Sequence, residues 1–371
     1  MVMLWPFRSL LLGLLPALAA LLASVSSLAG QAPLTSRVNP TPQSPRRIIL
    51  DVDPGIDDAM AVLLALQSPE LRVEAITVVS GNVMVDLGAE NALKLVELAG
   101  RPDVPVAKGA KYPLQRKPVT AEAFHGQNGL GEVQLPAPRK SLDSRHAVDV
   151  ILDIVNRNPG RITLVPVGPL TNIALAMLRD PGLSARIPEI ILMGGSIVGG
   201  NATAAAEANI YHDPEAAKVV FGSGVPIVMV DLGATSQARI TRRHLEELRR
   251  APSSIAKFVV AIADFYVDVS ERLGASGAAL HDPLAVGISI DKTLARVLRP
   301  MHIDVETKGE LTYGETVANR GLREERVEWR GDRYVVVDFP VVKPNAEVPI
   351  EVHGERFIRM FMERISRPEN R

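Results

Sequence analysis

Four carboxylates lie within eight residues in the segment DVDPGIDD, at positions 51 to 58. Asp51 and Asp53 alternate where an apolar run ends, and Asp57 and Asp58 follow a Pro-Gly turn. N-capping and a favourable helix dipole would explain Asp57 or Asp58 at about 1 kcal/mol, but they leave Asp53 without a role. A hard cation explains the whole cluster, because Ca²⁺ takes about six to eight oxygen ligands. The cluster therefore favours calcium, with Mg²⁺ as the weaker alternative.

A second acidic motif, HDPLA, begins at His281. Read alone, Asp282 before a proline is typical of a helix N-terminus, and His281 is an ordinary surface histidine. An acidic turn alone offers too few oxygen ligands for calcium, however, and needs a carboxylate from elsewhere in the chain. Beside the first cluster, Asp282 is therefore a candidate ligand.

A third polar group lies in the alanine-rich run NATAAAEAN, which contains Asn201, Glu207 and Asn209. Three hydrogen-bonding side chains among small residues suit a polyol ligand held close to the backbone. The alternative is a helix or loop with incidental polar positions.

Apolar runs and segments of helical period alternate from Arg46 onward, which predicts an α/β fold with an open, mostly parallel, Rossmann-like sheet flanked by helices. The strands are expected at residues 46–52, 73–81, 161–168, 189–195 and 226–233, with strand-like runs at 301–307 and 334–339. The helices are expected at residues 57–68, 88–100, 170–180, 241–274 and 353–366. Without repeats or a shift in composition, residues 46–371 are predicted to form one catalytic domain.

Polar or glycine-rich loops follow four of these strands. Ligands of parallel sheets bind where the carboxyl ends of the strands meet the loops. The sequence therefore predicts one site, built from the loops at residues 53–58, 80–82, 167–172 and 193–195.

The amino-acid composition limits the classes of protein to which the chain can belong. The chain has 371 residues, of which 47% are hydrophobic, with a net charge of −1 and no cysteine. These values fit a soluble globular protein and exclude disulfides, thiolate metal sites and the basic footprint of a nucleic-acid partner.

The first 30 residues have the pattern of a secretory signal peptide, with Arg8, an apolar stretch over residues 10–23 and small residues before Gly30. Residues 31–45 form a Pro/Ser/Thr-rich spacer that is predicted to be disordered. We therefore expect an exported protein, periplasmic or secreted. The alternative is an uncleaved segment that anchors the protein to a membrane.

Several motifs together resemble the inosine-uridine-preferring nucleoside hydrolase family, in that family's order: DVDPGIDDA, VVSGN, HGQNGLG, VPVGPLTNIALA, MGGSIVGGNATAAAEAN and LHDPLA. The resemblance covers residues 46–366. It implies hydrolysis of the N-glycosidic bond of ribonucleosides to free base and ribose, in purine and pyrimidine salvage or catabolism. It also implies bound Ca²⁺ and a homo-oligomer, dimer or tetramer.

The resemblance also assigns roles to residues. The implied calcium ligands are the carboxylates of Asp53, Asp58 and Asp282 and the carbonyl of Val167. Asp53 would be the general base for a calcium-bound water, Asn82 would orient that water, and His281 would be a candidate proton donor to the base. The implied substrate-binding residues are Asp57, Met193, Asn201, Glu207, Asn209, His125 and Tyr266.

Two positions depart from the family pattern. Ala208 replaces a large aromatic residue, which loosens the pocket and leaves the base preference open, and Asn128 replaces an aspartate without removing a ligand. Three assignments have structural alternatives. Phe265 and Tyr266 are candidates to stack on the base or ordinary core residues, and His125 is a substrate contact or a solvated loop residue.

Two other functional classes are compatible with parts of the sequence. A non-catalytic nucleoside- or pentoside-binding protein on this scaffold would be expected to lack the base or a metal ligand, yet Asp53, Asp58 and Asp282 are all present. A dehalogenase-like phosphatase also begins with Asp-x-Asp, but it needs a threonine where Gly55 stands.

Overall fold

The structure is a computed structural model that describes residues 44–319, 325–338 and 342–368. The predicted signal segment, residues 1–30, and nearly all of the predicted spacer lie outside the described residues. Within the described ranges, no helix combines the length and the apolar character that crossing a bilayer requires.

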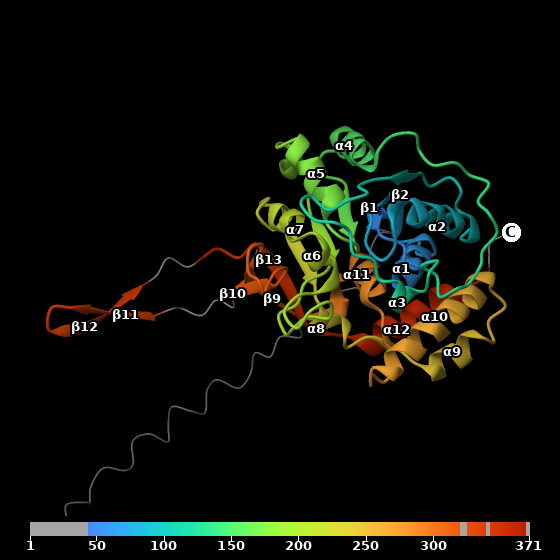
Figure 1. The fold of residues 1–371 in the computed structure, drawn as a ribbon. Coiled ribbons are helices and arrows are strands. Elements are labelled where there is room, and N and C mark those ends of the chain that lie inside the picture. The colour runs from blue at the N-terminus through green and yellow to red at the C-terminus, as the bar shows by residue number, and fades with distance from the viewer. Residues whose placement is uncertain (1–43, 320–324, 339–341, 369–371) are drawn as a thin grey trace, which may run out of the picture. The chain divides into compact units, whose positions relative to one another are not determined.

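A nine-stranded sheet forms the centre of the molecule (Figure 1). Neighbouring strands from β13 to β3 are parallel, whereas β9 and β10 at one edge are antiparallel. The predicted open, mostly parallel sheet is therefore confirmed. Its spatial order is β10 (Thr316–Asn319), β9 (Ala295–Val305), β13 (Ala346–Val352), β6 (Ile227–Val230), β5 (Ile190–Met193), β4 (Thr163–Pro166), β1 (Arg46–Val52), β2 (Leu71–Val78) and β3 (Val106–Lys108).

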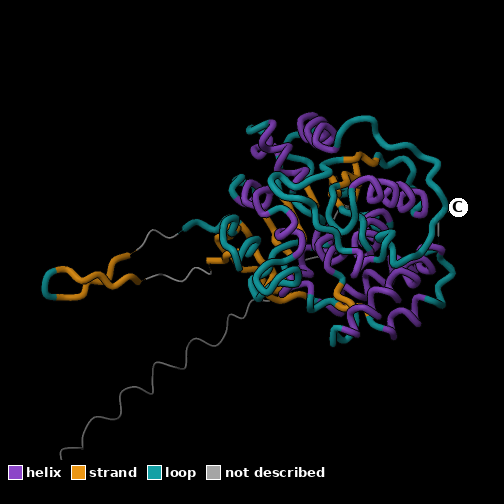
Figure 2. The backbone as a smooth tube through the Cα atoms, in the orientation of Figure 1, coloured by secondary structure: helices purple, strands orange, loops and turns teal. Residues whose placement is uncertain are grey.

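Helices cover both faces of this sheet (Figure 2). Side chains alternate along a strand, so that Leu50 of β1 packs into one core and Ile49 into the other. The first core is closed by α1 (Ile56–Leu66), α2 (Val85–Leu98), α9 (Arg242–Leu248), α10 (Ser254–Arg272), α11 (His281–Ile290) and α12 (Gly354–Ser366). The second is closed by α4 (Ala147–Arg157), α5 (Thr171–Arg179), α7 (Pro214–Phe221) and the 3₁₀ helix η1 (Leu183–Arg186).

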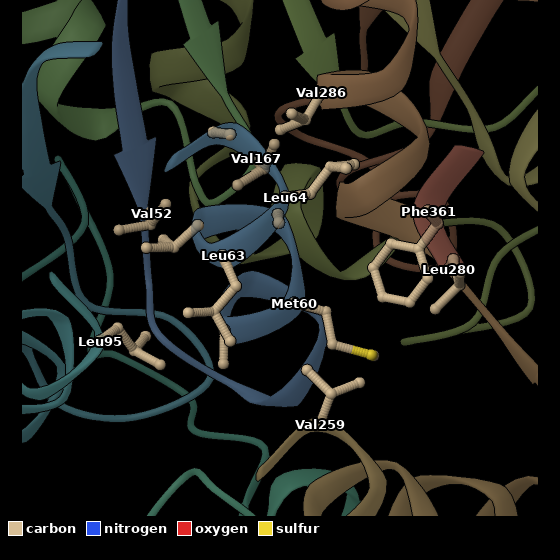
Figure 3. Packing of buried hydrophobic residues seen from close by; sticks show 14 of the residues in the cluster. Val52, Met60, Leu63, Leu64, Leu95, Val167, Val259, Leu280, Val286 and Phe361 are labelled. Atoms are coloured by element: carbon tan, nitrogen blue, oxygen red, sulfur yellow. The ribbon is translucent and has the colours of Figure 1, made fainter. Parts of the chain in front are cut away.

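Helix α1 lies in the middle of the first core, and every one of its residues is buried. Beyond Asp57 and Asp58 in its first turn the helix is apolar on all sides, and it packs against α2, α10, α11 and α12. Figure 3 shows Met60 and Leu63 of this helix among side chains such as Val259 and Phe361, which come from distant parts of the chain. This packing fixes the start of α1, where Asp57 and Asp58 lie.

Shorter elements complete the fold. The short helices are α3 (Glu122–His125), α6 (Ala208–His212), α8 (Leu232–Thr235) and η2 (Lys292–Leu294). Strands β7 (Arg239–Ile240) and β8 (Ala278–Ala279) pair with each other, and β11 (Glu325–Arg330) and β12 (Arg333–Asp338) form a hairpin.

The prediction of one helical segment over residues 241–274 is wrong, because α9 and α10 are separate helices. Pro252 interrupts the segment, and the hydroxyl of Ser253 accepts a hydrogen bond from the backbone N–H of Ala256 to cap α10. The strand expected at residues 301–307 is longer at its amino end, because β9 begins at Ala295 and pairs with β13.

Candidate active site

The four predicted loops meet at one edge of the sheet. They follow β1, β2, β4 and β5, which are neighbours in the sheet and run parallel. A cavity of about 440 Å³ opens at this edge. All of the predicted site residues except Asp53 and Asp58 line it, namely Asp57, Asn82, His125, Val167, Met193, Asn201, Glu207, Asn209, Tyr266, His281 and Asp282.

Three carboxylates gather on one side of the cavity. One oxygen from each of Asp57, Asp58 and Asp282 lies within 4.8 Å of the others, and all three residues are buried. The start of α1 provides two of them and the start of α11 the third, because these two helices pack against each other. The tertiary structure thus brings the distant carboxylate to the acidic turn, although this trio contains Asp57 where the resemblance implied Asp53.

Asp53 lies buried next to this trio, at the end of β1. Its Oδ2 accepts a hydrogen bond of 2.7 Å from the backbone N–H of Asn82, whereas its buried Oδ1 has no partner among the described residues. Gly81 and Gly168 pass close to this carboxylate. A Cβ added at Gly81 would lie 2.0 Å from Oδ2, and a Cβ added at Gly168 would lie 2.3 Å from Oδ1. Glycine is therefore needed at both positions.

Asp58 does cap α1, as the alternative interpretation proposed. Its two oxygens accept hydrogen bonds of 3.0 Å from the backbone N–H groups of Asp53 and Gly55. The side-chain amide of Asn82 donates a further bond of 2.9 Å to Oδ2. Capping does not explain Asp57, whose buried Oδ1 has no hydrogen-bond partner within the described part of the chain.

The electrostatics of this acidic group favour a bound cation. Burial, and then the charge of Asp58, holds the pKa of Asp53 well above its usual range. Burial, and then the charge of Asp57, does the same for the pKa of Asp282. Burial also raises the pKa of Asp57 to about 6. Carboxylates that are buried together stay ionised at neutral pH only where positive charge offsets their repulsion.

A second wall of the cavity carries amide and carboxylate groups. Glu207 caps α6 and accepts hydrogen bonds from the backbone N–H groups of Gly195, Asn209 and Ile210. The side-chain amide of Asn209 donates to the carbonyl of Val167 at 2.7 Å. These bonds hold the polar side chains of the alanine-rich run in fixed positions around the cavity.

Aromatic and imidazole rings form another part of the lining. His125 and Tyr266 stack with ring centroids 6.0 Å apart and an interplanar angle of 28°. His125 is buried and its Nδ1 accepts a hydrogen bond from the backbone N–H of Ile56, so the solvated-loop alternative is wrong. The Nδ1 of His281 lies 2.7 Å from the hydroxyl of Thr235.

Tyr266 lines the cavity and also belongs to the buried hydrophobic core, whereas Phe265 packs against that core and is not part of the lining. Asn128 lies outside the cavity lining and holds its own loop, because its Oδ1 accepts hydrogen bonds from the backbone N–H groups of Leu130 and Glu132.

Sequence analysis did not single out several residues of the site. Part of the lining comes from the loop before α3 and from the ends of α6 and α10, and it includes Val119, Tyr211, His212, Ser270 and Leu273. Periodicity carries no signal for such positions. The two glycines beside Asp53 belong to the predicted loops, and their close approach to the carboxylate is visible only in the tertiary structure.

Comparisons with known proteins agree with this geometry. The family model described as inosine-uridine preferring nucleoside hydrolase matches residues 48–359. The inosine-uridine preferring nucleoside hydrolase of Crithidia fasciculata is 44% identical over 74% of this chain and 88% of its own length. The pyrimidine-specific ribonucleoside hydrolase RihA of Photobacterium profundum is 38% identical over 86% of this chain and 99% of its own length.

Solved structures show the same likeness. A plant nucleoside hydrolase superposes with a TM-score of 0.79 at 36% sequence identity, covering 87% of this chain and 100% of its own. The residues that the family model matches include all four loops of the site. The chain belongs to the inosine-uridine preferring nucleoside hydrolase family.

Proposed function

We propose that this nucleoside hydrolase uses a bound Ca²⁺ to cleave the N-glycosidic bond of ribonucleosides, giving free base and ribose. The printed names of its relatives support ribonucleosides as the substrate class. One structural observation carries the proposal: a buried acidic cluster and side chains suited to a polyol face the same cavity. A catalytic cation and a sugar would therefore meet there.

The donor set fits a hard divalent cation. Asp58 and Asp282 would hold it, together with Asp53 and the carbonyl of Val167, and Asp57 lies in the same group. All of these donors are oxygens, and the buried Oδ1 atoms of Asp53 and Asp57 have no hydrogen-bond partner in the described structure. When bound, such an ion lowers the pKa of water and offsets the negative charge of the carboxylates.

Asp53 would act as the general base. The backbone N–H of Asn82 fixes its Oδ2, and Oδ1 is left to accept a proton from the attacking water. Gly81 and Gly168 lie against its two oxygens, so the carboxylate can occupy only one position. Orientation of this kind contributes to catalysis because the base need not reorganise as the proton moves.

The second wall would hold the ribose. Cleavage builds positive charge on the ribosyl ring in an oxocarbenium-like transition state. The carboxylate of Asp57 and the polar groups of Asn201, Glu207 and Asn209 would bind the hydroxyls, while Met193 backs the sugar. Negative and dipolar groups that are already oriented stabilise such charge without reorganisation.

The base would lie in the ring-lined part of the cavity, beside His125, Tyr266 and His281. Burial, and then the charge of Arg239, lowers the pKa of His281 to about 4. A neutral imidazole can donate a hydrogen bond to the departing base, and it carries no net charge that would oppose the cation nearby. This role makes His281 the leaving-group contact.

The test is to incubate the purified protein with inosine, adenosine, uridine and cytidine and to measure the release of reducing sugar with and without a calcium chelator. Asp53→Ala should lower kcat by about 100-fold or more while the circular dichroism spectrum is retained. Asp103→Asn, which removes an exposed carboxylate paired with Arg101, is the matched control and should keep wild-type turnover.

Three outcomes would contradict parts of the proposal. Full activity in the chelator would exclude the calcium role, and wild-type turnover by Asp53→Ala would exclude the general base. Binding of nucleosides without any cleavage would favour the alternative of a non-catalytic binding protein.

We also propose that the protein is exported and forms a homo-oligomer. Export rests on the signal-like sequence of residues 1–30, with membrane anchoring as the alternative. Cell fractionation combined with N-terminal sequencing of the mature chain tests export and cleavage, and light scattering tests the oligomeric state.

A further inference from the structure

Thr235 is a buried residue beside the site that the proposed mechanism does not use. It ends helix α8, its side chain is fully buried, and it is not part of the cavity lining. Its hydroxyl oxygen lies 2.7 Å from Nδ1 of His281, the proposed contact to the departing base. The two residues are 46 positions apart in the chain, so only the tertiary structure brings them together.

Backbone pairing holds Thr235 and His281 against each other. Strand β7, which follows Thr235, pairs with β8, which precedes His281. The backbone N–H of Leu280 also donates a hydrogen bond of 2.9 Å to the carbonyl oxygen of Ala238. Helices α8 and α11, which carry the two residues, contact each other as well. The short distance between the hydroxyl and the imidazole is therefore fixed by the fold.

The distances indicate where the hydroxyl hydrogen of Thr235 lies. A hydroxyl has one hydrogen to donate. Among the described residues it has two acceptors, the carbonyl oxygen of Leu232 at 3.4 Å and Nδ1 of His281 at 2.7 Å. Hydrogen bonds from hydroxyl groups span about 2.5–3.0 Å, so only Nδ1 lies within the normal range. The hydroxyl therefore donates to Nδ1, which must carry a lone pair.

A lone pair on Nδ1 fixes the state of the other ring nitrogen of His281. A neutral imidazole carries one N–H, which must then be on Nε2. The Nε2 atom is not fully buried and has no hydrogen-bond partner among the described residues, and His281 lines the cavity. Nε2 thus offers a donor to the cavity. The opposite tautomer would present a lone pair there, which would repel the electrons that the departing base receives.

We propose that Thr235 is a positioning residue that sets the tautomer of His281, so that Nε2–H donates a hydrogen bond to the departing base. This inference rests on the proposed function. When the bond between C1′ and the base nitrogen breaks, its electron pair passes to the base. A donor that is already oriented stabilises the negative charge that develops there. Thr235 acts only through His281, because it lies outside the cavity lining.

The experiment compares two replacements of Thr235 with the wild type at saturating Ca²⁺. Thr235→Val nearly keeps the shape of the side chain and removes the hydroxyl, whereas Thr235→Ser keeps the hydroxyl. Thr293→Val is the matched control, because it removes a hydroxyl that bonds to Asp291 outside the cavity lining. The control should match the wild type in both readouts.

The first readout is the tautomer of His281, measured by nitrogen-15 NMR of protein labelled at histidine. The chain has seven histidines, so the signals of His281 can be assigned by their loss in His281→Ala. The wild type and Thr235→Ser should show hydrogen on Nε2 and none on Nδ1. Thr235→Val should show a mixture of both tautomers. This readout does not depend on catalytic activity.

The second readout is kcat for inosine and for 4-nitrophenyl riboside, whose leaving group departs as a stable anion and needs no donor. Thr235→Val should lower kcat for inosine relative to the nitrophenyl substrate by about three- to tenfold, the range of one neutral hydrogen bond. Thr235→Ser should keep the wild-type ratio. In a His281→Ala background, Thr235→Val should not change the ratio further, because both residues act through one hydrogen bond.

Three results would overturn the inference. Hydrogen on Nδ1 in the wild type would do so without any variant, even if Thr235→Val did not fold. An unchanged tautomer in a folded Thr235→Val, or an equal loss of kcat for both substrates, would leave Thr235 with a structural role only. If NMR shows the predicted tautomers but no nucleoside is cleaved, the proposed function fails, and the control of the tautomer by Thr235 stands.

Discussion

Replacement of Gly168 by alanine tests how tightly the structure holds Asp53. Gly168 follows β4, directly after the carbonyl of Val167, and its backbone φ is compatible with any residue. The new methyl carbon would lie 2.3 Å from Oδ1 of Asp53, 2.9 Å from its Cγ and 3.1 Å from its backbone nitrogen. The substitution therefore acts through contact with the proposed general base, and backbone strain at Gly168 does not contribute.

The size of the effect follows from these distances. Ordinary van der Waals contact begins at 3.4 Å, so the carboxylate or the loop must move by about 1 Å. Neither side can give way easily, because Gly81 lies against the other oxygen of Asp53. Overpacking of this kind costs about 1–3 kcal/mol of unfolding free energy. A displacement of about 1 Å at a catalytic group costs about 100-fold in rate.

The assay combines kcat/KM for uridine at saturating Ca²⁺ with unfolding in urea. We expect Gly168→Ala to lose about 100-fold in kcat/KM and about 1–3 kcal/mol in unfolding free energy. Gly182→Ala is the matched control, since its new Cβ would meet only ordinary contacts at 3.4 Å or more in a surface turn. It should behave as the wild type does.

One result would refute this reasoning. If Gly168→Ala folds and cleaves uridine at the wild-type rate, the position of Asp53 does not matter to within 1 Å. Asp53 would then not be the general base.

Three other predictions concern charge in the site. Burial raises the pKa of Asp51 to about 7 from 3.8, so the folded metal-free protein keeps a proton that the unfolded chain releases. The contribution of Asp51 to the unfolding free energy should therefore be greatest below pH 4 and fall by about 4 kcal/mol up to pH 7, and the difference between the wild type and Asp51→Asn in urea titrations at several pH values should follow this fall. Calcium at about 100 times its Kd should raise the unfolding free energy by about 2.7 kcal/mol at pH 8, and Asp282→Asn should abolish most of this gain in thermal melts. Because no lysine or arginine lines the described cavity, uridine 5′-monophosphate should be cleaved at least about 100-fold less efficiently than uridine, and similar rates for the two would contradict the proposed ligand class.

The first half of the sheet was predictable because its strands and helices are local and nearly continuous apolar runs. The acidic turn after β1 and the loops after β2, β4 and β5 were placed at one edge from the parallel arrangement alone. The break between α9 and α10 was missed, although Pro252 marks it, because the helical period continues on both sides.

The site was predictable where residue type alone limits the chemistry. Carboxylates in a glycine-containing turn, and polar groups among alanines, indicate a cation and a polyol whatever the fold. The state of single residues was not predictable in this way. His125 could be a solvated loop residue or a buried one until its contacts with Ile56 and Tyr266 were known.

The sequence by itself determined the alternating elements, the oxygen-rich character of the site and the family to which its motifs point. Only the tertiary structure decided that Asp282 reaches the acidic turn, that Asp57 joins the carboxylate trio and that Thr235 lies against His281. The physical reason is that chain-distant contacts, burial and hydrogen-bond satisfaction depend on how α1, α8 and α11 pack, and no local pattern records that packing.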